Sequence, residues 1–128
     1  MFNWLERLIG IRHRAELLCD SEVIPLDKDE YILGRAKDEE ESKFVTGLKK
    51  MVALFGRRIV FNGFFKTISK NQGRFRWNGE TYEYTNLSST SKPLIVKRRN
   101  KIYTSSKPVP LDRGDKIVFD DFTFEFVK

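Results

Sequence analysis

Residues 74–84 read RFRWNGETYEY, and this stretch decides the fold class. Two short runs rich in aromatic residues, 74–77 and 81–84, flank the dipeptide Asn78-Gly79. Asn-Gly between two such runs is the strongest short-range signal for a β-hairpin. The sequence therefore predicts two antiparallel strands here and a sheet around them.

Turn residues separate further strand-like runs on both sides of this hairpin. We expect strands at 15–19, 23–26, 31–33, 94–96, 101–104, 116–119 and 123–127. In the last of them, Phe122, Phe124 and Phe126 fall on one face, whereas Thr123 and Glu125 fall on the other. Many short strands with turns roughly every 8–12 residues indicate an all-β protein, a β-sandwich.

Two segments have helical periodicity instead. Residues 2–13 carry a broad apolar stripe, which predicts a short N-terminal helix that packs on the domain or, alternatively, lies on a membrane or partner. The acidic run 38–41 precedes apolar residues at helical spacing, namely Phe44, Val45, Leu48, Met51, Val52 and Phe55. This pattern predicts an amphipathic helix over roughly 40–55, ended by Gly56. The expected organisation is a helix at 1–14 and a sandwich at 15–128, with a helical insertion at about 36–66.

Length and composition limit the class of protein. A chain of 128 residues with 40% hydrophobic and 33% charged residues suits one globular domain. The most apolar runs, 51–56 and 59–65, are too short to cross a bilayer, and no secretory signal is evident. Cys19 is the only cysteine, which excludes an intramolecular disulfide. We therefore expect a cytoplasmic location.

The same residue counts argue against catalysis. One Cys and one His cannot build a zinc site rich in these residues, and no GxxxxGK[ST] or HExxH motif occurs. A nucleophile pair would have to join Cys19 to His13, and no neighbouring residue would orient the base. A buried thiol and a surface imidazole are the simpler interpretation. We expect no enzyme activity, no cofactor and no metal.

Charge is distributed unevenly along the chain. Residues 27–41 hold seven acids against three bases, a net of −4, and residues 108–128 have a net of −2. Residues 56–107 hold twelve Lys or Arg against Glu80 and Glu83, a net of +10. Such a region attracts anionic partners, unless it is simply the solvated surface of a basic protein.

Four segments in this order resemble the forkhead-associated (FHA) domain family. They are YILGR at 31–35, ISKNQGRF at 68–75, NLSSTSKP at 86–93 and LDRGDKIVF at 111–119. They resemble, respectively, the family's strand ending in Gly-Arg, its Ser-Arg-x-His segment, its Asp-Leu-x-Ser-Thr-Asn-Gly-Thr loop and its closing Leu-x-x-Gly-Asp-x-Ile element. The resemblance implies a sandwich of about eleven strands that recognises a phosphorylated protein.

The resemblance also implies a binding site for phosphothreonine. Arg35 and Ser69 would contact the phosphate, Lys70 would assist, and the loop of Ser89, Thr90 and Ser91 would hold the peptide backbone. A phosphate dianion needs several converging donors, best with a guanidinium among them. The alternatives are a surface Arg35 paired with Asp38 or Glu39, and a Ser69 that only begins a turn.

The chain departs from the family pattern at two places in the proposed site, and its stretch from Arg35 to Ser69 is also longer than the family's and carries the predicted inserted helix. Gln72 stands where the family has a His that braces the loop, and an amide can partly replace it through its own hydrogen bonds. Ser91-Lys92 stands where the family has Asn-Gly, which removes a donor–acceptor pair and the conformational freedom of Gly. These departures bear on affinity for phosphothreonine and not on the fold.

Three functions are therefore considered. The first is a non-catalytic adaptor that binds phosphothreonine peptides. The second is binding of nucleic acid by residues 56–107, where aromatic residues alternate with basic ones: Trp77, Tyr82, Tyr84 and Tyr103 with Arg74, Arg76, Lys97, Arg98, Arg99 and Lys101. The third is an assembly protein that has lost phosphate recognition and self-associates through the helix at 40–55.

Overall fold

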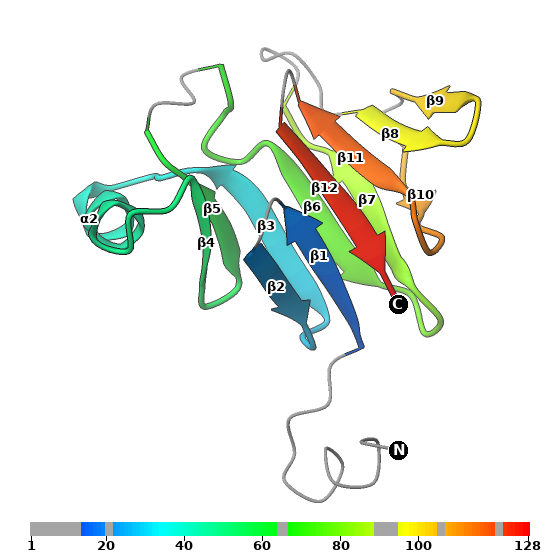
Figure 1. The fold of residues 1–128 in the computed structure, drawn as a ribbon, viewed down its shortest axis with the longest axis horizontal. Helices are drawn as coiled ribbons and strands as arrows, with labels where there is room; N and C mark the ends of the chain where they lie inside the picture. Colours follow the sequence, from blue (N-terminus) through cyan, green and yellow to red (C-terminus); the bar gives the residue numbers. More distant parts are fainter. Residues whose placement is uncertain (1–13, 20–21, 64–66, 89–94, 105–106, 120–121) are drawn as a thin grey trace, which may run out of the picture.

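The structure is a computed structural model that describes residues 14–19, 22–63, 67–88, 95–104, 107–119 and 122–128 (Figure 1). The helix predicted at 2–13 lies outside these ranges, and so do Ser89, Thr90 and Ser91. The expected boundary between a helix at 1–14 and the sandwich therefore stays a prediction.

Two six-stranded sheets form a sandwich. The first has the order β2-β1-β12-β11-β8-β9, with bounds Glu22–Leu26, Ala15–Cys19, Phe122–Val127, Lys116–Phe119, Ile95–Arg98 and Lys101–Tyr103. The second has the order β10-β7-β6-β3-β5-β4, with bounds Val109–Pro110, Tyr82–Asn86, Gly73–Trp77, Glu30–Arg35, Arg58–Phe61 and Val52–Phe55. β3 and β5 pair in parallel, and the other pairs are antiparallel. The predicted all-β sandwich is confirmed, with twelve strands in the described ranges instead of the eleven expected.

The core lies between the two sheets and follows the predicted alternation. Phe124 and Phe126 point inward from β12, and Thr123 and Glu125 point outward. Phe61 of the second sheet meets Phe124 of the first with ring centroids 5.7 Å apart, in an edge-to-face contact that aromatic rings prefer. The hairpin predicted at 74–84 is confirmed as β6 and β7, with Gly79 at a φ of 102° between them.

The predicted helix over 40–55 is wrong in its second half. Helix α2 spans Glu39–Gly47, and the side chain of Asp38 caps its N-terminus by accepting a hydrogen bond from the Glu41 N–H at 2.9 Å. Leu48 caps the C-terminus, and Lys49 then adopts a left-handed φ of 57°. A left-handed residue directly after the cap is a common way to end a helix.

Strands β4 and β5 follow in place of the remaining helix. Gly56, at a φ of 63°, lies in the turn between them and does not end a helix. Val52 faces the main core, whereas Ala53 and Phe55 face α2, so the period is two. The run MVALF at 51–55 is apolar at every position and therefore fits either period, which explains the error. Leu48 and Met51, expected to be buried, are exposed.

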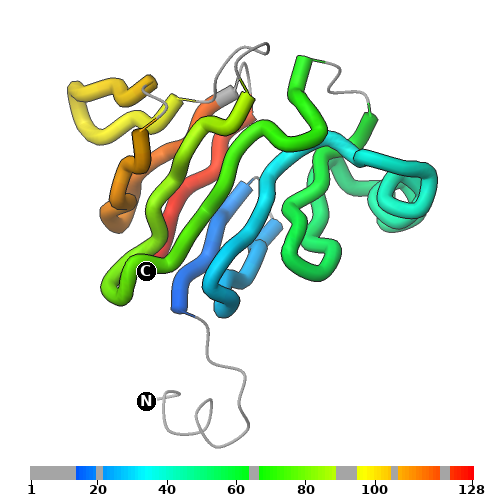
Figure 2. Tube along the Cα trace, turned by 180° about the vertical axis from the view of Figure 1, so that it is seen from behind, coloured from blue at the N-terminus to red at the C-terminus, as the bar shows by residue number. Residues whose placement is uncertain are grey.

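Helix α2 covers the outer face of β4 and β5. Val45 packs with Ala53 and Val60, and the rings of Phe44 and Phe55 lie 4.8 Å apart. The apolar side of the helix therefore packs within the chain, apart from the exposed Leu48, and self-association through residues 40–55 stays a prediction. Figures 1 and 2 show α2 and the β8–β9 hairpin at opposite ends of the molecule. Among the described residues, no helix is long and apolar enough to span a membrane.

Candidate functional site

The end of β3 lies directly against the loop that carries Ser69 and Lys70. The backbone N–H of Arg35 donates to the backbone oxygen of Ser69 at 3.1 Å. A Cβ atom at Gly34 would overlap the backbone oxygen of Lys70, so this close approach requires glycine. Two predicted site segments, Gly34-Arg35 and Ser69-Lys70, are thus brought together.

Gln72 braces this loop from inside the molecule. The side chain is fully buried, and its Oε1 accepts a hydrogen bond from the Ser69 N–H at 3.0 Å. The backbone of Gln72 donates to Leu33 at 2.8 Å and accepts from Leu87 at 2.9 Å. One amide residue therefore connects β3, the 69–72 loop and the start of the next loop. In the family that the sequence resembles, a histidine at this position has the same bracing role.

The loop that follows β7 approaches the loop of Ser69 and Lys70 through a serine that the sequence analysis did not single out. The hydroxyl oxygens of Ser69 and Ser88 lie 2.8 Å apart, within hydrogen-bond distance. Ser88 directly precedes the predicted peptide-binding residues Ser89, Thr90 and Ser91, which lie outside the described ranges. The described part of the loop after β7 therefore lies next to Ser69, as the sequence pattern implies.

Arg58 of β5 connects the two loop segments to α2. Its Nη2 donates to the backbone oxygens of Lys70 at 2.8 Å and Arg35 at 3.2 Å, and its Nη1 donates to Asn71 Oδ1 at 3.1 Å. Its Nε forms an ion pair with Glu41 Oε2 at 2.7 Å. Nothing in the sequence pattern distinguished Arg58, because its partners meet only through the parallel pairing of β3 and β5.

A surface depression of about 400 Å³ opens beside these residues. It is lined by Arg35, Ala36, Lys37, Asp38, Glu39, Ser42, Gly63 and Lys70. Asp38 caps α2, and Glu39 pairs with Lys43 at 3.0 Å. Within the described ranges no carboxylate forms an ion pair with Arg35 or Lys70. Arg35 is thus not paired with Asp38 or Glu39, which was the alternative interpretation.

The four aromatic residues considered for nucleic-acid binding, Trp77, Tyr82, Tyr84 and Tyr103, do not form a stacking surface. Tyr82 and Tyr84 are buried in the core, and burial raises the pKa of Tyr82 to about 12. Trp77 packs edge-to-face on Tyr82, with the guanidinium of Arg14 over its ring at 5.0 Å. The guanidinium of Arg98 lies over Tyr103 at 5.3 Å. Bases would find no exposed row of rings among these four residues, which weakens the nucleic-acid interpretation.

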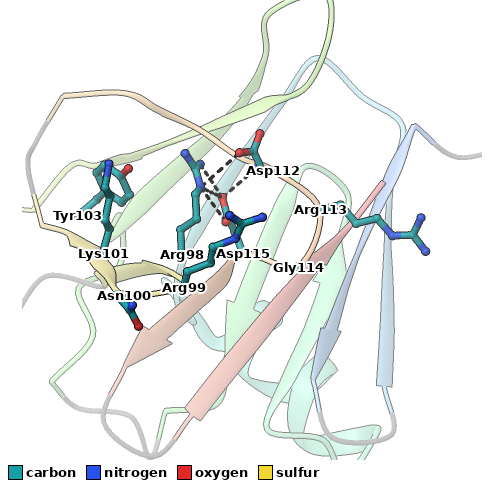
Figure 3. A pocket seen from close by; sticks show the side chains of 9 residues that line it. All are labelled: Arg98, Arg99, Asn100, Lys101, Tyr103, Asp112, Arg113, Gly114 and Asp115. Atoms are coloured by element: carbon teal, nitrogen blue, oxygen red, sulfur yellow. Dashed lines mark hydrogen bonds and ion pairs between the residues drawn. The ribbon is translucent and has the colours of Figure 1, made fainter.

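A second arginine cluster lies at the other end of the molecule (Figure 3). Arg98 of β8 donates to both carboxylate oxygens of Asp115, with its Nε at 2.9 and 3.1 Å and its Nη2 at 2.7 Å. Hydrogen bonding to Asp115 raises the pKa of Arg98 above its usual value. The same Nη2 donates to the backbone oxygen of Pro110 at 2.6 Å.

The residues that the structure describes contain no cluster of three or more His, Cys, Asp or Glu placed to hold a metal ion. Cys19 is buried in the main core, as a structural thiol would be.

Solved structures of FHA domains share this fold. One, solved in work on phosphothreonine-dependent FHA domain interactions, has a TM-score of 0.55 and 17% identity, over 89% of this chain and 95% of that one. The FhaA FHA domain in complex with the intracellular domain of Rv3910 has a TM-score of 0.55 and 18% identity, over 88% and 98%. The FHA structure of Rv0020c has a TM-score of 0.52 and 20% identity, over 88% and 90%.

No protein-family model matches the chain. No curated protein sequence matches it either. The structural likeness establishes the fold, which is that of FHA domains, in agreement with the resemblance found in the sequence.

Proposed function

We propose that this chain is a cytoplasmic, non-catalytic adaptor that binds a phosphothreonine of a partner protein at the Arg35 end of β3. One observation carries the proposal. Arg35 and Lys70, without ion-pair partners among the described residues, are held side by side by the backbone contacts of Gly34, Arg35 and Ser69. The FHA fold supports it, since one related structure comes from work on phosphothreonine-dependent interactions.

The residues would divide the work according to their chemistry. The Arg35 guanidinium offers a planar fork that matches two phosphate oxygens, and the Lys70 ammonium adds a point charge. The Ser69 hydroxyl, which lies 2.8 Å from that of Ser88, would be a third donor to the phosphate. Ser89, Thr90 and Ser91 would contact the backbone of the peptide. Binding of this kind forms and breaks no covalent bond, which agrees with the role of an adaptor.

The experiment compares one threonine peptide in phosphorylated and unphosphorylated form. Hydrogen bonds to charged groups contribute about 1.5–3 kcal/mol each, so Arg35→Ala is expected to weaken phosphopeptide binding roughly tenfold to a hundredfold. Arg35→Lys is expected to restore part of the affinity, because an ammonium lacks the planar fork. Isothermal titration calorimetry of the full chain measures both.

Arg57→Glu is the matched control. Arg57 is an exposed arginine in the turn between β4 and β5, and its backbone oxygen accepts from the N–H of Ile32, near the opposite end of β3 from Arg35. This variant is expected to bind the phosphopeptide as the unmodified chain does. The proposal is wrong if Arg35→Ala binds as tightly as Arg57→Glu, or if phosphorylation of the peptide makes no difference.

A further inference from the structure

The β8–β9 hairpin forms an edge of the first sheet and carries a cationic pocket on one side. The pocket has a volume of about 560 Å³ and lies between the hairpin and the turn that precedes β11. Its lining residues are Arg98, Arg99, Asn100, Lys101, Tyr103, Asp112, Arg113, Gly114 and Asp115 (Figure 3). No strand of the second sheet contributes to this lining.

The charge of Arg98 is already satisfied. Asp115, which is almost fully buried, accepts from it and also from the backbone N–H of Asp112 at 2.8 Å. These contacts attach the turn to the hairpin and fix the wall of the pocket. Arg98 therefore has a structural role, and a ligand of this pocket would be contacted by neighbouring residues.

Arg99 and Lys101 are the neighbours that remain available. Both are exposed, and no carboxylate in the described part of the chain forms an ion pair with them. Arg99 has a φ of 52°, in the first position of a two-residue turn, where glycine is preferred. An arginine in a left-handed conformation costs about 1 kcal/mol. Arg99 therefore keeps a charged side chain at the tip of the hairpin at a cost in backbone strain, and strained residues of this kind often have a function.

The outer edge of β9 has no strand paired with it in the described part of the chain. β9 has only β8 as a neighbour among the described strands. Arg98 and Lys101 flank the two-residue turn and form its hydrogen-bonded pair, so the N–H and C=O of Ile102 point toward the open edge. The Ile102 side chain is 60% exposed. An extended polypeptide would find backbone partners and an apolar contact at this residue.

We propose that β9 is the docking edge for an acidic segment of a partner polypeptide, which extends the first sheet and places its carboxylate or phosphate groups beside Arg99 and Lys101. A second copy of β9 would bring like charges together, and lysine at an edge disfavours such self-pairing. The same charges favour an acidic strand. Nucleic acid fits less well, because it cannot pair with the backbone of β9.

The experiment uses the full chain and a fluorescein-labelled peptide in which Glu alternates with Thr. The same peptide with Gln in place of Glu tests charge, and a version with alternate backbone N-methylation tests strand pairing. Oligodeoxythymidylate is the nucleic-acid probe. The double variant Arg99→Glu, Lys101→Glu is compared with Arg57→Glu, which carries a charge reversal on a distant turn. Fluorescence anisotropy gives affinities, and amide hydrogen exchange reports on Ile102.

We expect the Glu peptide to bind, the Gln and N-methylated peptides to bind much more weakly, and the double variant to lose about tenfold or more in affinity. Arg57→Glu and Arg35→Ala should bind the Glu peptide as the unmodified chain does, which separates this surface from the phosphothreonine site. Exchange of the Ile102 amide should slow on binding. The proposal is overturned if the double variant binds normally, if N-methylation has no effect, or if only oligodeoxythymidylate binds.

Discussion

Arg58 and Arg98 occupy opposite ends of the molecule and are held in similar ways. Each guanidinium lies on a carboxylate whose side chain is only 2% exposed, Glu41 for Arg58 and Asp115 for Arg98. Each also donates to the backbone of segments distant in the sequence, Arg58 to Arg35 and Lys70, and Arg98 to Pro110. Both arginines thus join a strand to distant segments of the chain, and neither is left to bind a ligand.

The two clusters differ in what they hold in place. Arg58 contacts the backbone oxygens of Arg35 and Lys70, whose side chains are the proposed phosphate ligands. Arg98 fixes a turn and a hairpin whose exposed cations are Arg99 and Lys101. In each case a buried ion pair provides a rigid base, and its neighbours present the charge to solvent. Burial requires a charge to be paired, which explains the division.

The clusters also differ in exposure. The side chain of Arg58 is 13% exposed, and that of Arg98 is 28% exposed. An arginine that water reaches more easily recovers more hydration when its carboxylate is removed. The comparison therefore predicts that loss of Glu41 costs more stability than loss of Asp115.

The largest effect is expected for Glu41→Ala. Removal of one partner of a buried ion pair leaves an uncompensated charge, and a loss of about 3 kcal/mol in the free energy of unfolding is expected. Urea denaturation measures it. Phosphopeptide affinity should fall as well, because Arg58 no longer holds the loop of Lys70 in a fixed position. Glu40→Ala, an exposed neighbour on the same helix, should change stability by less than about 0.5 kcal/mol. Equal stability of the two variants would contradict the assigned role of Arg58.

Asp115→Ala is expected to have the second-largest effect. The cost should be about 2 kcal/mol, because the more exposed Arg98 is partly rehydrated and the Asp112 N–H loses its acceptor. Phosphopeptide affinity should stay unchanged, since the cluster lies at the other end of the molecule. Asp112→Ala is the control, because the Asp112 side chain is 70% exposed and 3.4 Å from Arg98 Nε. A loss of phosphopeptide binding in Asp115→Ala would show that the two ends are coupled.

Much of the fold was predictable because local patterns determine it. The alternation of Phe122, Phe124 and Phe126 and the Asn78-Gly79 turn predicted strands that the structure contains. The end of α2 was not predictable, because the apolar residues from Met51 to Phe55 fit either period. Only the pairing of β4 with β5 and the contact of Ala53 with the helix decide between them.

The candidate site was predictable in part. The sequence pattern brought Arg35, Ser69 and Lys70 into one hypothesis, and the structure places them together. Glu41 and Arg58 were not recognised as partners, because they are 17 positions apart and meet only when β5 pairs in parallel with β3. Non-local pairing of this kind leaves no periodic signal in the sequence.

The smallest expected effect concerns the strained arginine of the β8–β9 hairpin. Glycine adopts a positive φ without the steric cost that arginine has, but it also gains freedom in the unfolded chain. Arg99→Gly is therefore expected to raise the free energy of unfolding by only about 0.5 kcal/mol, while it weakens binding of the acidic peptide. Lys49→Gly is the matched control, because Lys49 has a φ of 57° after the C-terminus of α2 and does not line the pocket of the β8–β9 hairpin. It should gain a similar stability and bind the acidic peptide normally. If Arg99→Gly keeps full affinity for that peptide, the strain at Arg99 has no role in binding, and the cationic tip of the hairpin is a solvated surface.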